Sequence, residues 1–280
     1  MRMLRVAATL VVAVVTTGCL SIDSNIKVKP DGTGTIEQTM LVNSSAMGMM
    51  SMMGGDGDEK AKGPGAAEMF SEEKLKAEAA KLGEGVTYVS STPAAAGEMK
   101  GVKAIFAFTD FNKLKLTTSP PNVGGGEGDA APMEASGSFS TLDMVLARTG
   151  ASSLITLDMF GDKAKAAAAD KAETPTAGEN PFGDMPKEML GMMAPMMKDM
   201  RVAVSIEPVG QLVRTNATHV EGQRITVLDI AFGELFANPA SFEKMQKLGN
   251  DPSLEQIRTA LAGVKGIKVN EVEKLEIEFK

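Results

Sequence analysis

Polar and apolar side chains alternate along residues 20–30 with a period of two. The even positions are mostly apolar and the odd positions are polar: Leu20, Ile22, Ser24, Ile26 and Val28 against Ser21, Asp23, Asn25, Lys27 and Lys29. This alternation predicts a strand with one buried face. Asp31-Gly32 is a residue pair that tight turns favour, and apolar positions continue through 36–42. The segment is therefore predicted to be a β-hairpin that serves as scaffold.

Other patterns predict the remaining elements. A helix is expected to begin after Ser71 as N-cap, with Phe70 and Leu75 as a hydrophobic staple, and to end at Gly83. Further strands are expected near 86–90, 102–108, 139–147, 154–159, 202–206, 225–232 and 275–279, and further helices over 185–200, 240–248 and 254–262. Short turns between strands favour antiparallel pairing. The predicted fold class is α+β, an antiparallel sheet with helices packed on one face.

Three segments of low complexity interrupt these elements, near 44–68, 117–137 and 160–183. They bury too little apolar surface to offset the entropy of ordering, so they are predicted to be disordered loops. Within the last of these, the stretch 163–180 could instead form a short solvated helix, but Pro175, Gly178 and Pro181 favour a linker. Residues 19–280 are predicted to form a single periplasmic domain that carries these loops.

Residues 1–18 have the parts of a secretory signal: a basic start, an apolar stretch over 6–15, and small residues before a cleavage point. The apolar stretch is about half of the ~20 residues that a transmembrane helix needs. With Gly18-Cys19 at its end, the segment resembles a bacterial lipoprotein signal peptide. The resemblance implies that 1–18 are removed and that Cys19 becomes an acylated first residue, for example with palmitate. An ordinary secretory signal is the alternative.

The residue after the cysteine bears on location. Leu20 stands where an aspartate would signal retention in the inner membrane. By the same resemblance, the expected location is the outer membrane, facing the periplasm, and the alternative is the outer face of the cytoplasmic membrane. The lipid makes the membrane a predicted partner.

Composition narrows the range of partners. The net charge is -7, and removal of 1–18, which hold Arg2 and Arg5 but no acid, changes it to -9. A chain with this much negative charge binds nucleic acid poorly, so no nucleic-acid partner is expected. One cysteine allows no disulfide within the chain, so the fold depends on a core drawn from its 43% hydrophobic residues.

Catalytic patterns are missing from the sequence. It has no Gly-x-Ser-x-Gly motif, its one thiol is assigned to the lipid, and its one histidine, His219, lies in a predicted turn. Metal sites of the His/Cys type are excluded by count. Asp56, Asp58 and Glu59 lack the ligand series of a calcium loop and are interpreted as a solvated acidic loop. The protein is predicted not to be an enzyme and to need no cofactor.

Methionine is the compositional anomaly, with 21 residues concentrated in clusters at 47–53 and 185–200. Thioethers select Cu(I), so a methionine-based copper site is one interpretation. The other is that flexible methionines line a core or a ligand groove. Met189, Met192 and Met196 follow helical spacing and would share one helix face, which favours core or groove over copper. These three residues are the candidate ligand-binding residues.

A family resemblance adds an expected fold. It rests on Pro208-Val209-Gly210, Thr215-Asn216-Ala217, Glu221-Gly222 and 225–229, together with Asp31-Gly32-Thr33-Gly34 after the cysteine. These stretches resemble the LppM-type bacterial lipoproteins over about a third of the chain, which implies a helix-grip-like fold related to lipid-binding proteins. The predicted function is non-enzymatic binding of an apolar or lipid-like molecule, or of an envelope partner. A Cu(I)-binding protein and a structural envelope assembly factor without ligand are the alternatives.

Overall fold

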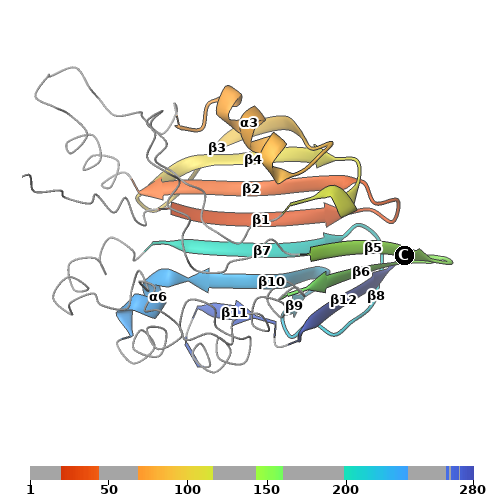
Figure 1. The fold of residues 1–280 in the computed structure, drawn as a ribbon. Coiled ribbons are helices and arrows are strands. Elements are labelled where there is room, and N and C mark those ends of the chain that lie inside the picture. Colours follow the sequence, from red (N-terminus) through yellow and green to blue (C-terminus); the bar gives the residue numbers. More distant parts are fainter. Residues whose placement is uncertain are drawn as a thin grey trace, which may run out of the picture.

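The computed structural model describes residues 20–43, 69–115, 143–159, 199–238, 263–264, 266–270 and 272–280. These residues form β1 (Leu20–Val28), β2 (Gly34–Asn43), α3 (Glu72–Leu82), β3 (Thr87–Ala96), β4 (Met99–Phe108), η1 (Phe111–Lys113), β5 (Asp143–Thr149), β6 (Ser152–Asp158), β7 (Arg201–Pro208), β8 (Leu212–Thr215), β9 (Val220–Glu221), β10 (Arg224–Ala231), α6 (Phe232–Ala237), β11 (Ile267–Val269) and β12 (Lys274–Phe279). Figure 1 shows how they are arranged. The three predicted loops, the signal segment, and all of the helices predicted over 185–200, 240–248 and 254–262 except 199–200 lie outside the described residues.

An eight-stranded sheet is the larger layer, with the order β11-β10-β7-β1-β2-β4-β3 and with β9 paired to β10. The predicted hairpin is confirmed, because β1 pairs with β2 from Leu20↔Val42 to Val28↔Gly34. Its alternation is confirmed too, since the even positions of β1 are buried. The opposite neighbour of β1 is β7, which runs parallel to it. The first strand of the described chain is thus central in the sheet.

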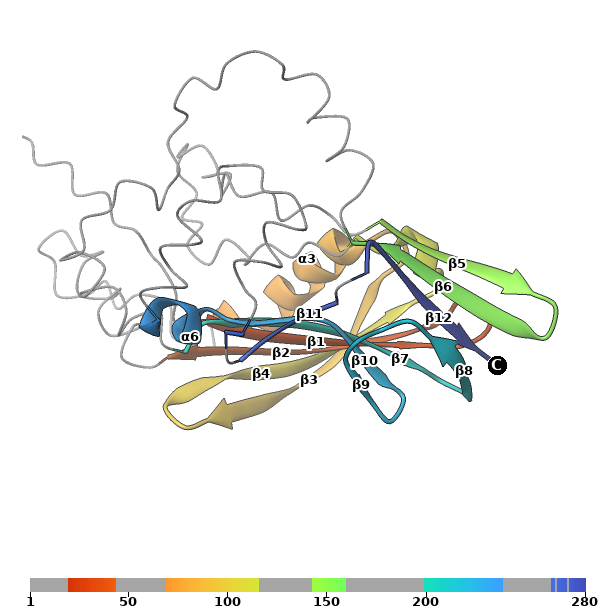
Figure 2. The same cartoon turned by 90° about the horizontal axis from the view of Figure 1, so that it is seen from below.

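A second sheet of four strands has the order β5-β6-β12-β8. Figure 2 shows this sheet and α3 on the same side of the eight-stranded sheet. Side chains from both sheets and from α3 join in one hydrophobic core, among them Ile36 and Phe106 of the large sheet, Leu157 and Ile277 of the small sheet, and Leu75 of α3. The core therefore lies between the two sheets and under the helix.

The predicted α+β, helix-grip-like fold is wrong. Among the described residues strands predominate, and the α-helices are α3 and the short α6. The four-stranded sheet, with α3, covers the surface that helices were expected to cover. The large sheet is also mixed, because β1 and β7 are parallel. Alternation predicted most of these strands, but it does not say which sheet a strand joins, and this is why the second layer was missed.

The helix predicted after Ser71 is confirmed as α3, with Ser71 as N-cap and Gly83 as C-cap. The side chain of Ser71 makes no capping hydrogen bond, so the cap rests on backbone conformation rather than on the hydroxyl. Leu75 is buried, and Phe70 packs against the same core. The helix is therefore fixed mainly by the apolar side chains it turns toward the sheet.

The β1–β2 turn is the point where the two sheets meet. Asp31 accepts hydrogen bonds from the backbone N (2.9 Å) and Oγ1 (2.7 Å) of Thr33, which stabilises the turn and lowers the pKa of the Asp31 carboxyl. The hydroxyl of Ser153 in β6 donates to the carbonyl of Pro30 at 3.0 Å. The backbone N of Phe111 donates to the carbonyl of Gly32 at 2.9 Å. These two hydrogen bonds attach the hairpin turn to β6 of the small sheet and to η1.

Edge strands of both sheets carry features that limit further pairing. At β5 the side chain of Asn112 takes the place of a neighbouring strand: its Oδ1 accepts from the backbone N of Leu146 at 2.7 Å and its Nδ2 donates to the carbonyl at 3.4 Å. At β3 a bulge between Tyr88 and Ser90 and the proline Pro93 interrupt the edge. Such devices protect sheet edges from unwanted pairing, so binding by strand addition is disfavoured at these two edges.

Candidate functional site

The face of the eight-stranded sheet that points away from the core is polar. In β1 the odd positions turn to this face, because the even positions enter the core. Figure 2 shows no labelled helix or strand layer over this side of the sheet. We call the following residues the polar face: Asp23, Asn25, Lys27, Glu37, Lys103, Arg201, Ser205, Glu207, Arg224, Asp229 and Lys268.

Two arginines and two aspartates form the strongest contacts of the polar face. Arg201 holds Asp229 in a two-point contact, Nε to Oδ1 at 2.7 Å and Nη2 to Oδ2 at 2.8 Å. The Asp229 side chain is only 13% exposed, and its hydrogen bonds raise the pKa of Arg201. Arg224 donates from Nη2 to Oδ1 of Asp23 at 2.9 Å. Paired in this way, each arginine is fixed in position by a carboxylate from another strand.

A buried polar chain continues this network across β7 and β1. Arg224 Nε donates to the hydroxyl of Ser205 at 2.9 Å, and that hydroxyl donates to Oδ1 of Asn25 at 3.0 Å. The amide of Asn25 then donates to Oε2 of Glu207 at 2.7 Å. Ser205 is 2% exposed and Asn25 is 8% exposed. Buried polar groups that are satisfied in this way fix the register of the strands that carry them.

Lysines and one glutamate close the network on the other side of β1. Glu37 lies between two ammonium groups, with Lys27 at 2.6 Å and Lys103 at 2.8 Å. The hydrogen bonds from Lys103 and Lys27 lower the pKa of the Glu37 carboxyl, and the bond to Glu37 raises the pKa of Lys27. Charges of opposite sign therefore alternate along the face, and most cations already have a partner.

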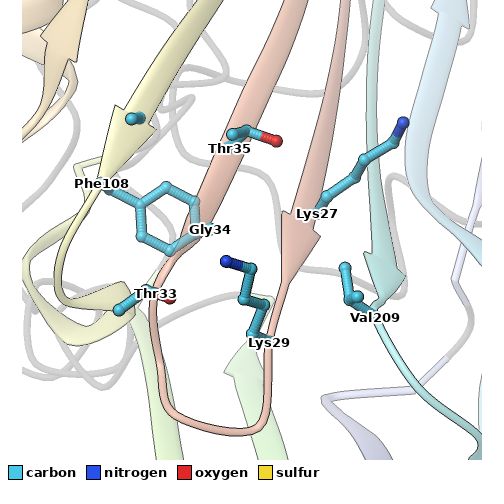
Figure 3. Close-up of a pocket in the computed structure, with 8 residues that line it drawn as sticks. Lys27, Lys29, Thr33, Gly34, Thr35, Phe108 and Val209 are labelled. Atoms are coloured by element: carbon cyan, nitrogen blue, oxygen red, sulfur yellow. The ribbon is translucent and has the colours of Figure 1, made fainter.

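A pocket of about 310 Å³ opens on this face at the end of the β1–β2 hairpin, as Figure 3 shows. Its lining mixes cationic, hydroxyl and apolar groups: Lys27, Lys29, Thr33, Gly34, Thr35, Ala107, Phe108 and Val209. In Figure 3 the ammonium of Lys29 points in among the lining side chains, whereas that of Lys27 points away along the sheet. We call this the turn pocket.

Lys29 and Gly34 give the turn pocket its character. Within the described part of the chain Lys29 has no ion-pair partner, in contrast to Lys27, which contacts Glu37. Gly34 leaves the space that the Phe108 ring fills, because a Cβ there would lie 2.5 Å from Cζ of Phe108. The exposed side chain of Val209 provides an apolar wall. Among the described residues the pocket thus offers one ammonium group without a salt bridge, near enough to the Asp31 carboxyl to lower its pKa, beside an apolar surface.

A smaller pocket of about 140 Å³ lies at the other end of the polar face. It is lined by Asp23, Arg201, Ala203, Val204, Ser205, Glu221, Arg224, Thr226, Asp229 and Lys268. Its cations are already engaged, Arg201 by Asp229, Arg224 by Asp23, and Lys268 by Glu221 at 2.9 Å. An incoming anion would have to displace a carboxylate, so this pocket is the weaker candidate.

One buried polar group on the core side has no hydrogen-bond partner within the part of the chain that the structure describes. Gln38 is 7% exposed, and among the described residues its Oε1 has no hydrogen-bond partner. The register places it beside Ser24 of β1 and Ala104 of β4. A buried acceptor without a donor costs about 1–3 kcal/mol, so a bound donor at this point would be favourable.

The described residues give little support to covalent or metal chemistry. No group of three or more His, Cys, Asp and Glu side chains in this part of the chain could hold a metal ion. His219 lies between β8 and β9, and its carbonyl accepts from the backbone N of Thr226 at 3.0 Å. Within the described ranges no helix has both the length and the apolar character to span a membrane.

The sequence-predicted site residues Cys19, Met189, Met192 and Met196 lie outside the described residues. Their roles in lipidation, ligand binding and Cu(I) binding stay predictions. Met200, at the end of the second cluster, is described and precedes β7; its carbonyl accepts from the backbone N of Phe232 at 2.9 Å.

The residues of the polar face and the turn pocket were missed. The signal that could have found part of them is the alternation in 201–207, where Arg201, Ser205 and Glu207 share the odd positions. The alternation over 20–30 gives the same signal for Asp23, Asn25 and Lys27, but neither pattern shows that the two strands lie side by side.

Comparisons with known proteins give one structural likeness and no sequence match. No protein-family model matches the chain, and no curated protein matches it. Among solved structures, the folded domain of LppM from Mycobacterium tuberculosis, determined by NMR, is similar with a TM-score of 0.32 and 11% identity, over 94% of this chain and 90% of that chain. A likeness at this level is too remote to support an argument about function.

Proposed function

We propose that this chain is a lipid-anchored protein of the bacterial envelope, facing the periplasm from the outer membrane, that binds an apolar or lipid-like molecule or an envelope partner without catalysing a reaction. The observation that supports the anchor is the position of β1. Strand β1 includes Leu20, the residue after Cys19, and Leu20 is already paired with Val42 of β2, so a lipid at Cys19 would be joined directly to the large sheet.

The turn pocket supports the binding part of the proposal. Its apolar lining from Phe108 and Val209 favours a hydrocarbon group, and the ammonium of Lys29 favours a carboxylate or phosphate next to it. An amphipathic anion, such as a fatty acid, has both. Because Lys27 already pairs with Glu37, Lys29 is the residue that would select for the negative charge of the ligand.

Replacement of Cys19 by serine tests the anchor. We expect Cys19→Ser to move the protein from the membrane pellet to the soluble fraction after a carbonate wash, because the acyl chains supply its membrane affinity. Incorporation of radiolabelled palmitate should disappear with the same change. Ser21→Ala is the matched control, since it alters a neighbouring residue and keeps the thiol. Retention of Cys19→Ser in the pellet would show that the protein is held there by other means.

Removal of one charge tests the turn pocket. A fluorescent fatty acid should bind the purified protein, and Lys29→Gln should weaken that binding about two- to fivefold, the contribution of one exposed ion pair. Val209→Ser should also weaken it by removing an apolar contact. Lys274→Gln, on the small sheet, is the control for overall charge. Equal losses for Lys29→Gln and Lys274→Gln would mean that the probe senses net charge and not this pocket.

A further inference from the structure

The described structure leaves no spacer between the predicted lipid and the folded body. Leu20 is paired with Val42 of β2, and Ser21 with Arg201 of β7, so the chain is fixed in the middle of the large sheet from its first described residues. Leu20 is only 9% exposed. Consecutive Cα atoms are about 3.8 Å apart. The residue that carries the proposed lipid is therefore held next to the sheet by its peptide bond to Leu20.

Strand register shows which residues lie level with that point. Leu20 is level with Val42 of β2. One residue further along the sheet, Asn43 of β2 pairs with Met99 of β4, and Met99 pairs with Ala96 of β3. The β3–β4 turn at Gly97 lies one step further in the same direction. On the other side of β1, the end of β10 is at the level of Arg201. We call this edge of the large sheet the anchor end.

We propose that the anchor end lies against the lipid headgroups and that the strands of the large sheet run away from the bilayer. This inference rests on the proposed lipidation of Cys19. A central strand cannot detach from its neighbours without loss of the sheet, so a lipid inserted in the membrane brings the anchor end to the surface. The β3–β4 turn, at or beyond the level of Cys19, then reaches the headgroup region.

Charge does not by itself drive this contact. Among the described residues the anchor end carries both signs, with Glu98, Asp199 and, in α6, Glu234 against Lys100 and Arg201. Asp199 also accepts a hydrogen bond from Asn43 at 3.0 Å, and Arg201 is engaged by Asp229. A surface of mixed sign without an excess of cations gains little from anionic lipid, so the orientation is set by the anchor and should be insensitive to salt.

The opposite end of the molecule then faces the aqueous compartment. Strand β1 has 9 residues, which span about 30 Å at ~3.3 Å per residue. The turn pocket lies at the far end of β1, and both views show the β5–β6 turn on that same side, away from the anchor end. The pocket is thereby out of reach of the headgroups that surround the anchor, and its ligand must arrive through water.

Two matched variants, each with one added cysteine, test the orientation. Ala96→Cys at the anchor end and Ala151→Cys at the β5–β6 turn are exposed alanine positions beside hairpin turns. The lipidated full chain, whose own cysteine is blocked by acylation, is labelled with a thiol-reactive fluorophore. It is then placed in phosphatidylcholine vesicles that contain a headgroup-nitroxide lipid as quencher. We expect the label at 96 to lose most of its fluorescence and the label at 151 to keep it, at low and high salt alike.

Each outcome is decisive. Equal quenching of the two labels would mean that the molecule lies flat, and stronger quenching at 151 would mean that it is inverted; both overturn the proposed orientation. Lys100→Cys provides a second label position at the anchor end if Ala96→Cys does not fold. Vesicle flotation separates the two proposals: a chain that does not float lacks the anchor, and both fail, whereas a floating chain without quenching at 96 and 100 refutes only the orientation.

Discussion

The substitution Gly34→Ala is expected to cost about 3 kcal/mol or more of stability, a large share of the ~5–15 kcal/mol that typical domains have. A Cβ at this position would lie 1.9 Å from the backbone carbonyl oxygen of Lys27 and 2.5 Å from Cζ of Phe108. The carbonyl belongs to the paired strand β1, so it cannot move aside without breaking the hairpin. Chemical denaturation followed by circular dichroism would measure the loss.

Gly150→Ala is the matched control for this prediction. Gly150 also sits at a hairpin turn, with φ of 63°, and nothing lies within 4 Å of its Cβ position. Its replacement should therefore cost only the ~1–2 kcal/mol of a left-handed backbone conformation. Similar losses for the two variants would indicate that close packing at Gly34 is not the cause. Gly34→Ala should also distort the turn pocket and reduce fatty acid binding.

The hairpin that contains Gly34 is the part of the fold that sequence reasoning predicted best. Alternation over 20–30 and the Asp31-Gly32 pair are local signals, and the structure has the strands and the turn where they were expected. The helix α3 was predicted for the same reason, because its caps and apolar spacing lie within a few residues of each other. Local patterns are reliable when the interactions that form the element are themselves local.

The layer arrangement depends on contacts that the sequence does not display. Strands β8 and β11 have 4 and 3 residues, too few for a recognisable period. The strands β5 and β6 pair with each other, but β12, which adjoins β6, lies far along the chain. No property of 274–279 indicates that it joins the small sheet and not the large one. The incorrect helical layer in the prediction follows from this lack of signal.

The polar face was unpredictable for a related reason. Arg224 and Asp23 are separated by 201 positions, and Asn25 and Glu207 by 182. Each residue taken alone is an ordinary polar side chain on a strand. Only the register of β7 against β1 and β10 brings them within hydrogen-bond distance. The proposed lipidation motif, in contrast, consists of residues that are adjacent in the chain, and it stays a prediction because it lies outside the described residues.

Phe279→Ala is expected to cost about 3–5 kcal/mol, the usual range for a fully buried phenylalanine. Phe279 is 0% exposed, as are Leu275 and Ile277 on the same face of β12. This strand is internal to the small sheet, with β6 on one side and β8 on the other, so the cavity would open where both sheets share the core. Lys274→Ala, an exposed position at the start of the strand, should cost less than ~0.5 kcal/mol. Urea denaturation of both variants gives the comparison. A small loss for Phe279→Ala would mean that the small sheet contributes little to the core and can separate from the large one.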